Sequence, residues 1–127
     1  MLNKTNMLNP LSLAFVGDAV YTLEVRKRLT LDSRRPVNDL HKESVKYVNA
    51  ASQAQAVKML LPLLSEDEQS VFKRGRNAHA GHTPKNQSEG DYHYATGLEA
   101  LFGFLFLNGE SERITELFDL IWSDKIG

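Results

Sequence analysis

The hydrophobic residues of this chain recur every three to four positions along most of its length, which is the period of an amphipathic helix. No segment shows the sustained alternation of apolar and polar residues that is typical of a strand. The first helix is predicted to begin at Asn9-Pro10, with Asn as its cap and Pro in its first turn, and to end near Leu29. The pattern therefore predicts an all-α fold.

A break at residues 32–36 separates this helix from a long second one. Asn38 or Asp39 is expected to cap the second helix, since both side chains accept hydrogen bonds from the free backbone amides of a helix start. Apolar residues at helical spacing continue to Leu60, and Pro62 should end or bend the helix because it lacks a backbone donor.

Ser65 followed by Glu68 is a capping-box pattern, which predicts the start of a short helix that ends near Gly75. Residues 75–90 contain three glycines and a proline and are expected to form a loop. A loop of this length inside so small a domain is usually functional or mobile.

Two more apolar segments complete the predicted bundle. Residues 91–107 should form a helix that stops at Asn108-Gly109, a pair typical of helix carboxyl ends. An amphipathic helix should then start near Ser111. With 127 residues, of which 42% are hydrophobic, the chain suits one compact domain over residues 1–127.

Composition excludes several classes of protein. Cysteine is absent, so neither a disulfide framework nor a thiolate metal site is possible. No apolar run approaches the roughly 18–20 residues needed to cross a bilayer, and the amino terminus lacks the apolar core of a secretory signal. We therefore expect a cytoplasmic protein with no membrane partner.

The net charge of −1 argues against a nucleic-acid-binding protein, but the distribution of charges matters more than their sum. Residues 73–85 contain basic side chains and no acid, whereas the acids gather elsewhere. Such a segment is suited to contact phosphates, although a solvated polar loop is the alternative. His79 and His82 are not a convincing metal pair, because nothing nearby completes a zinc site.

Two acidic residues lie in strongly apolar segments. Asp18 is the only charge in LSLAFVGDAV, and Glu99 is the only charge in ATGLEALFGFLFL. We expect both carboxylates to be largely buried, which is costly without a partner. Gly17 and Gly97 precede them closely and would let another backbone or a ligand approach.

If the two helices pack together, Asp18 and Glu99 would converge and share a divalent cation. Oxygen ligands of this kind suit Mg²⁺ or Mn²⁺. The alternative is that each acid is held by hydrogen bonds or by a salt bridge to another helix.

Four segments together resemble one enzyme family. LSLAFVGDAV is similar to the signature helix of ribonuclease III, and TGLEALFGFLFL is similar to the second acidic segment of that family. LHKESVKYVNAASQA resembles its long middle helix, and FKRGRNA precedes the loop as in Mini-III enzymes. The resemblance covers nearly the whole chain. It implies an all-α ribonuclease III-like endonuclease domain with no following double-stranded RNA-binding domain, because the chain stops at Gly127.

By this resemblance, Asp18 and Glu99 match the metal-binding catalytic acids of the family. The other two family acids fall at Ala14 and Thr96, so one Mg²⁺, with Mn²⁺ as a substitute, is expected rather than a symmetric pair. The implied reaction is hydrolysis of double-stranded RNA by a metal-activated water, which leaves 5′-phosphate and 3′-hydroxyl ends. The implied role is maturation of large-subunit (23S) ribosomal RNA precursor. Whether a large-subunit ribosomal protein presents the substrate is left open.

Candidate contacts with RNA and with a second subunit can also be named. The basic segment is expected to bind phosphates and 2′-hydroxyls of A-form RNA through Lys73, Arg74, Arg76, Asn77, His79, His82, Thr83 and Lys85. The family works as a homodimer through the signature helix, where Phe15 and Val16 are apolar, although ordinary core packing would explain them equally well. Two other readings remain: a catalytically silent ribonuclease III-like dimer that binds RNA or ribosomes, and a helical protein-interaction module.

Overall fold

A computed structural model describes residues 8–32, 34–78 and 88–126. Within these ranges it contains six α-helices and one short 3-10 helix (η1), and no strand. This confirms the predicted all-α fold. The elements in chain order are α2 (Pro10–Asp32), α3 (Val37–Val48), α4 (Ala50–Leu60), η1 (Leu61–Leu63), α5 (Glu66–Asn77), α6 (Glu89–Leu107) and α7 (Ser111–Ile126).

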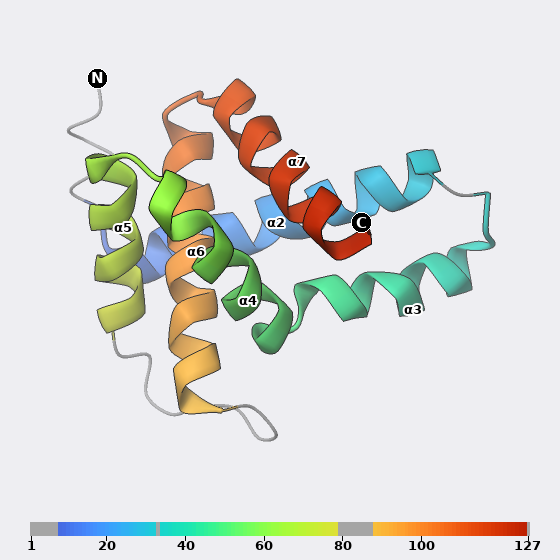
Figure 1. Ribbon diagram of the computed structural model, residues 1–127, viewed down its shortest axis with the longest axis horizontal. Helices are drawn as coiled ribbons and strands as arrows, with labels where there is room; N and C mark the ends of the chain where they lie inside the picture. Colours follow the sequence, from blue (N-terminus) through green and yellow to red (C-terminus); the bar gives the residue numbers. More distant parts are fainter. Residues whose placement is uncertain (1–7, 33, 79–87, 127) are drawn as a thin grey trace.

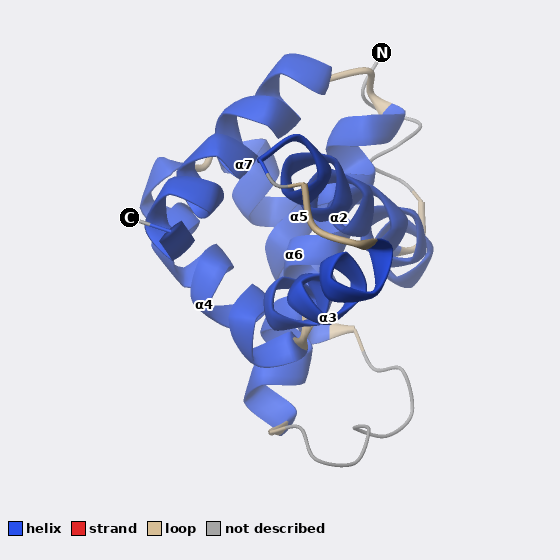
Figure 2. Ribbon diagram, turned by 90° about the vertical axis from the view of Figure 1, so that its right-hand side faces the viewer, coloured by secondary structure: helices blue, strands red, loops and turns tan. Residues whose placement is uncertain are grey.

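Helix α6 is the centre of the molecule. It is apolar on nearly every side, and such a helix is stable only when other elements cover all of its faces. Helix α2 crosses behind α6 in the view of Figure 1, α4 lies in front of it, and α5 and α7 flank it. The view turned by 90° in Figure 2 again places α6 between these helices. The middle of α6 is therefore enclosed by its neighbours, whereas its two ends reach the surface.

The predicted long second helix is wrong, because α3 and α4 are separate helices that meet at Asn49. Asn49 has an extended backbone conformation, and its side-chain oxygen accepts a hydrogen bond from the Ser52 amide at 2.9 Å. Its Nδ2 donates to the carbonyl oxygens of Val45 and Lys46 at 3.0 and 3.2 Å. One side chain thus caps the end of α3 and the start of α4. These side-chain hydrogen bonds compete with the backbone hydrogen bonds of a continuous helix, and the spacing of apolar residues does not reveal this competition.

The remaining boundaries follow the sequence more closely. The capping box is confirmed, since the Glu68 amide donates to Ser65 Oγ at 3.2 Å and the Ser65 amide donates to Glu68 Oε1 at 2.9 Å. Gly109 follows the end of α6 with a positive φ of 72°. Helix α2 continues past Leu29 to Asp32, whose carboxylate accepts a hydrogen bond from Trp122 Nε1 of α7 at 3.0 Å.

The start of α3 differs from the prediction as well. Pro36 is the residue that precedes its first turn, rather than Asn38 or Asp39, and no side chain caps it. In the part of the chain that the structure describes, none of the helices is long and apolar enough to cross a membrane.

Candidate active site

Two glycines allow α2 and α6 to touch through their backbones. A Cβ atom on Gly17 would lie 1.6 Å from the carbonyl oxygen of Glu99, and one on Gly103 would lie 1.9 Å from the carbonyl oxygen of Leu13. No side chain fits at either position. The expectation that Gly17 admits another backbone is therefore confirmed, and the partner is the segment of α6 that includes Glu99.

This crossing brings Asp18 and Glu99 together from distant parts of the sequence. The two carboxyl groups lie close enough for the charge of Asp18 to act on Glu99. Glu99 Oε2 also accepts a hydrogen bond from Gln53 Nε2 of α4, with an N–O distance of 3.4 Å. Three helices thus supply one polar cluster.

The expectation that Asp18 is buried is wrong. Asp18 is exposed and Glu99 is half-buried. Helix α2 buries the face that includes Leu13, Gly17 and Tyr21, and Asp18 lies beside that face. Phe15 on the same helix is also exposed, so part of the apolar character of this segment belongs to the surface.

The electrostatic environment of Asp18 and Glu99 favours the binding of a positively charged group. Burial and the nearby charge of Asp18, together with the hydrogen bond between the two carboxyls, raise the pKa of Glu99 to about 8, while the hydrogen bond from Gln53 opposes this rise. Among the described residues, neither acid forms an ion pair with a Lys, Arg or His side chain. Mutual repulsion therefore favours a state in which the two carboxyl groups share a proton or bind a cation.

The donor set fits a hard divalent cation. Two carboxylates, one of them open to solvent, suit Mg²⁺ or Mn²⁺, which usually keep several waters and use only one or two protein carboxylates. No group of three or more His, Cys, Asp or Glu residues suited to a metal ion occurs in the described ranges. Ala14 and Thr96 are buried, and the Thr96 hydroxyl donates to the Tyr92 carbonyl oxygen at 2.9 Å. Neither position adds a carboxylate to the pair.

The sequence motifs do not point to Gln53. Its side chain is 2% exposed and lies on the face of α4 that also buries Ala50, Ala54 and Val57. The available signal was a polar residue at a position that helical spacing assigns to the core.

Gly97, the second glycine expected to allow a close approach, has a different role from Gly17, because a Cβ there would meet the Phe72 ring of α5 at 2.6 Å.

The predicted RNA-contact residues fall into two groups. Lys73, Arg74, Arg76 and Asn77 lie in the last turns of α5, whereas His79, His82, Thr83 and Lys85 lie outside the described residues. The Arg76 guanidinium stacks against Phe72 and Tyr94, with its central carbon 5.7 and 6.0 Å from the two ring centroids. The Arg74 side chain donates to the Leu8 carbonyl oxygen at 2.9 Å, and Lys73 is exposed. Their role in binding RNA stays a prediction.

The two residues predicted at a dimer interface have different surroundings. The Phe15 side chain is 82% exposed, whereas Val16 is partly buried and packs against the core. Leu23, two turns further along α2, is also exposed. An exposed phenylalanine one turn from Asp18 is available for contact with another molecule.

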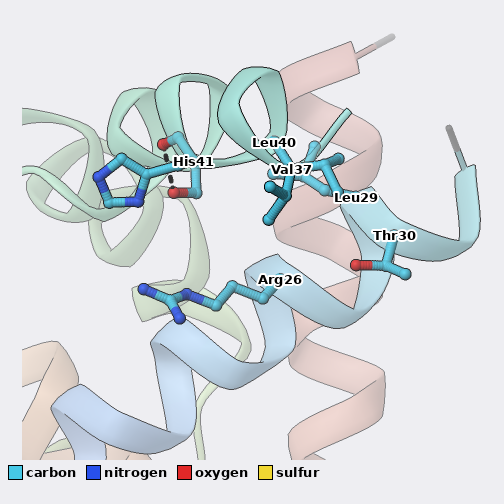
Figure 3. A pocket seen from close by; sticks show the side chains of 7 residues that line it. Arg26, Leu29, Thr30, Val37, Leu40 and His41 are labelled. Carbon is cyan, nitrogen blue, oxygen red and sulfur yellow. Dashed lines mark hydrogen bonds between the residues drawn. The ribbon is translucent and has the colours of Figure 1, made fainter. Parts of the chain in front are cut away.

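A separate groove lies between α2 and α3. Arg26 of α2 and His41 of α3 lie on one side of it, and Leu29, Val37 and Leu40 supply its apolar lining (Figure 3). Its lining residues include no Asp or Glu, so it offers no carboxylate ligand for a hard cation. It is distinct from the cluster of Asp18, Glu99 and Gln53.

Comparisons with known proteins agree with this architecture. A family model described as the ribonuclease III domain matches residues 11–110. A Mini-ribonuclease 3 from Thermoanaerobacter sp. is 50% identical over 113 residues, which cover 89% of this chain and 80% of the relative. Another from Brevibacillus brevis is 47% identical over 112 residues, covering 88% and 84%. A crystal structure of a protein from Fusobacterium nucleatum has a TM-score of 0.85 at 29% identity, covering 94% of this chain and 96% of that one. The chain therefore belongs to the ribonuclease III family of endoribonucleases, within its Mini-ribonuclease 3 group.

Proposed function

We propose that this ribonuclease cuts double-stranded RNA in a Mg²⁺-dependent reaction, with Asp18 and Glu99 as the metal-binding catalytic residues. The observation that supports the proposal is the contact between two carboxyl groups at the α2–α6 crossing, with no basic side chain paired to either in the described part of the chain. A structural acid pair would instead be expected to have a basic partner or a full set of hydrogen-bond donors.

The two acids would have different tasks. Glu99 projects from the central helix and is held by Gln53, which suits a fixed ligand. Asp18 is exposed, so it lies on the side from which a bulky substrate would arrive. A bound Mg²⁺ would supply Lewis-acid polarisation of the scissile phosphate and an activated water, and the products would have 5′-phosphate and 3′-hydroxyl ends.

Binding of the duplex would rely on its phosphates. Lys73 is exposed, and Arg76 presents a guanidinium at the end of α5. A-form RNA is recognised mainly through its backbone and 2′-hydroxyls, so a small number of cations on a rigid helix suits shape recognition without reading the sequence. The net charge of −1 means that this attraction is local and should weaken steeply with salt.

A homodimer would place one site opposite each strand. The exposed side of α2 offers Phe15 and Leu23, which are 82% and 63% exposed, on either side of Asp18 in the sequence. Burying two such side chains against a second copy removes apolar surface from water, and isologous contacts of this kind are the commonest route to a dimer. On the basis of the family resemblance, we propose a duplex within large-subunit ribosomal RNA precursor as the substrate. We also propose a cytoplasmic location.

The test is incubation of the purified chain with duplex RNA, with and without Mg²⁺. Cleavage should require the metal, and Asp18→Asn should abolish it while binding of the duplex remains. Ligation of the products would report the 5′-phosphate and 3′-hydroxyl ends. Binding without cleavage by the unmodified chain at saturating Mg²⁺ would instead favour the catalytically silent dimer, a reading that the loss of acids at Ala14 and Thr96 supports.

A further inference from the structure

Gln53 has an unusual place for an amide side chain. It is 2% exposed, on a face of α4 otherwise made of Ala50, Ala54 and Val57. Burying a polar side chain is costly unless it is hydrogen-bonded, and Gln53 Nε2 donates to Glu99 Oε2 at 3.4 Å. The residue that occupies this core position therefore points its donor at a proposed metal ligand.

The chemistry of the contact sets the direction of the amide. In the metal-bound form Glu99 is ionised and only accepts hydrogen bonds, so the NH₂ end of Gln53 faces it, as it does in the structure. An amide nitrogen does not ligate Mg²⁺, which takes oxygen ligands, so Gln53 does not compete for the cation. It uses one lone pair of Glu99 Oε2 and leaves the remaining lone pairs of the carboxylate for the ion. A donated hydrogen bond also favours the ionised form of Glu99, which is the form that binds a metal.

The position of Gln53 is fixed from its own helix. The Gln53 backbone amide donates to the Asn49 carbonyl oxygen at 3.0 Å, in the first turn of α4. The Asn49 side chain caps that same turn through Ser52. The break between α3 and α4 therefore sets the register in which Gln53 reaches α6.

We propose that Gln53 is a positioning residue of the metal site, which holds the Glu99 carboxylate in place and ready for a divalent cation. This inference rests on the proposed function. Groups that hydrogen-bond to a metal ligand typically change metal affinity or activity by about 10–100-fold when they are removed.

The experiment compares Gln53→Met with Gln55→Met. Methionine has nearly the same length as glutamine and no donor, and Gln55 is an exposed glutamine on the same helix. Binding of Mn²⁺ to each metal-free protein, without RNA, is measured by calorimetry and by the loss of the free-ion electron spin resonance signal. Gln53→Met should weaken binding by about 10-fold or more, whereas Gln55→Met should stay close to the unmodified protein.

Two further readouts separate positioning from general damage. In Gln53→Met the half-saturating Mg²⁺ concentration for cleavage should rise, while the rate at saturating Mg²⁺ stays near that of the unmodified protein. In the unmodified protein the side-chain amide resonances of Gln53 should shift when Mg²⁺ is added, and they should not shift in Glu99→Gln. This second readout still applies if Gln53→Met does not fold.

The outcomes distinguish the two proposals. Equal Mn²⁺ affinity of Gln53→Met and the unmodified protein, or Gln53 amide resonances that ignore Mg²⁺, would overturn the positioning role and leave the metal-dependent nuclease standing. Absence of Mn²⁺ binding by the unmodified protein would overturn the proposed metal site itself, and the positioning role with it.

Discussion

Gly17 of α2 and Gly103 of α6 lie against each other at the helix crossing, where a Cβ on Gly17 would be 2.8 Å from the Gly103 backbone nitrogen. The same missing side chain leaves room for the backbone of Glu99, whose carbonyl oxygen a Cβ on Gly17 would meet at 1.6 Å. Because Asp18 is the next residue after Gly17, the distance between the two acids depends directly on this contact.

Substitution of Gly17 by alanine should therefore force α2 and α6 apart. Overpacking a core typically costs about 1–3 kcal/mol, and here the obstacle is backbone, so we expect about 3 kcal/mol or more. The midpoint of thermal unfolding should fall by roughly 10 °C or more. Gly90→Ala is the matched control, since a Cβ at Gly90 has no atom within 4 Å. Equal melting temperatures for the two variants would contradict the close crossing.

The pKa of Glu99 predicts an unusual dependence of stability on pH. Its value of about 8, against 4.5 for an unperturbed glutamate, means that the folded chain binds more protons than the unfolded chain between these pH values. Stability should therefore fall as pH rises through this window in the absence of divalent cations. Glu99→Gln cannot ionise, so it should become more stable than the unmodified protein by about 1–3 kcal/mol near pH 9 and by little near pH 4.

Chemical denaturation at several pH values measures this difference. Glu112→Gln, which removes an exposed glutamate from α7, is the control and should show no such trend. Adding Mg²⁺ at pH 9 should stabilise the unmodified protein and leave Glu99→Gln unchanged. A stability difference that stays constant with pH would contradict the raised pKa of Glu99.

How much of this site the sequence reveals depends on the residue. Asp18 and Glu99 stand out because each is a single charge in an apolar segment, and the family motifs include both. The exposure of Asp18 could not be predicted, since it depends on which apolar residues of α2 remain at the surface. Gln53 is hidden for a related reason: its partner lies on another helix, and spacing within one helix says nothing about that contact.

The fold shows the same division. Ser65 and Glu68 correctly predict the start of α5, because the capping interaction joins residues that are close in the sequence. The break at Asn49 was missed because the apolar spacing of α3 continues into α4, and the asparagine that separates them also has an acceptable place inside a helix.

Loss of one cation from α5 should weaken RNA binding in a salt-dependent way. Lys73→Gln, made in the Asp18→Asn background to prevent cleavage, should reduce the slope of log affinity against log salt concentration by about 1. Lys42→Gln removes the same charge from an exposed site on α3, which Figure 1 places at the opposite end of the molecule from α5. Fluorescence anisotropy at several salt concentrations gives both slopes. A reduction of equal size in the two variants would remove the case for a binding surface at α5.

The exposed face of α2 should control self-association. Phe15→Ser removes an 82% exposed aromatic side chain, and we expect dimers to dissociate at concentrations about 10-fold or more above those for the unmodified protein. Leu120→Ser, on α7 and 40% exposed, serves as the control and should leave the dimer intact. Sedimentation equilibrium measures both. If the unmodified chain is a monomer at all protein concentrations measured, a mechanism in which one dimer cuts both RNA strands is excluded.

The central claim is that Asp18 and Glu99 hold one divalent cation between α2 and α6. A crystal structure with Mn²⁺, with the ion located by its anomalous scattering, tests it most directly. We expect one Mn²⁺ within bonding distance of an oxygen atom of each carboxylate, and no ion at this position in Asp18→Asn. An ion bound to only one of the two acids, or found elsewhere while this pair shares a proton, would contradict it.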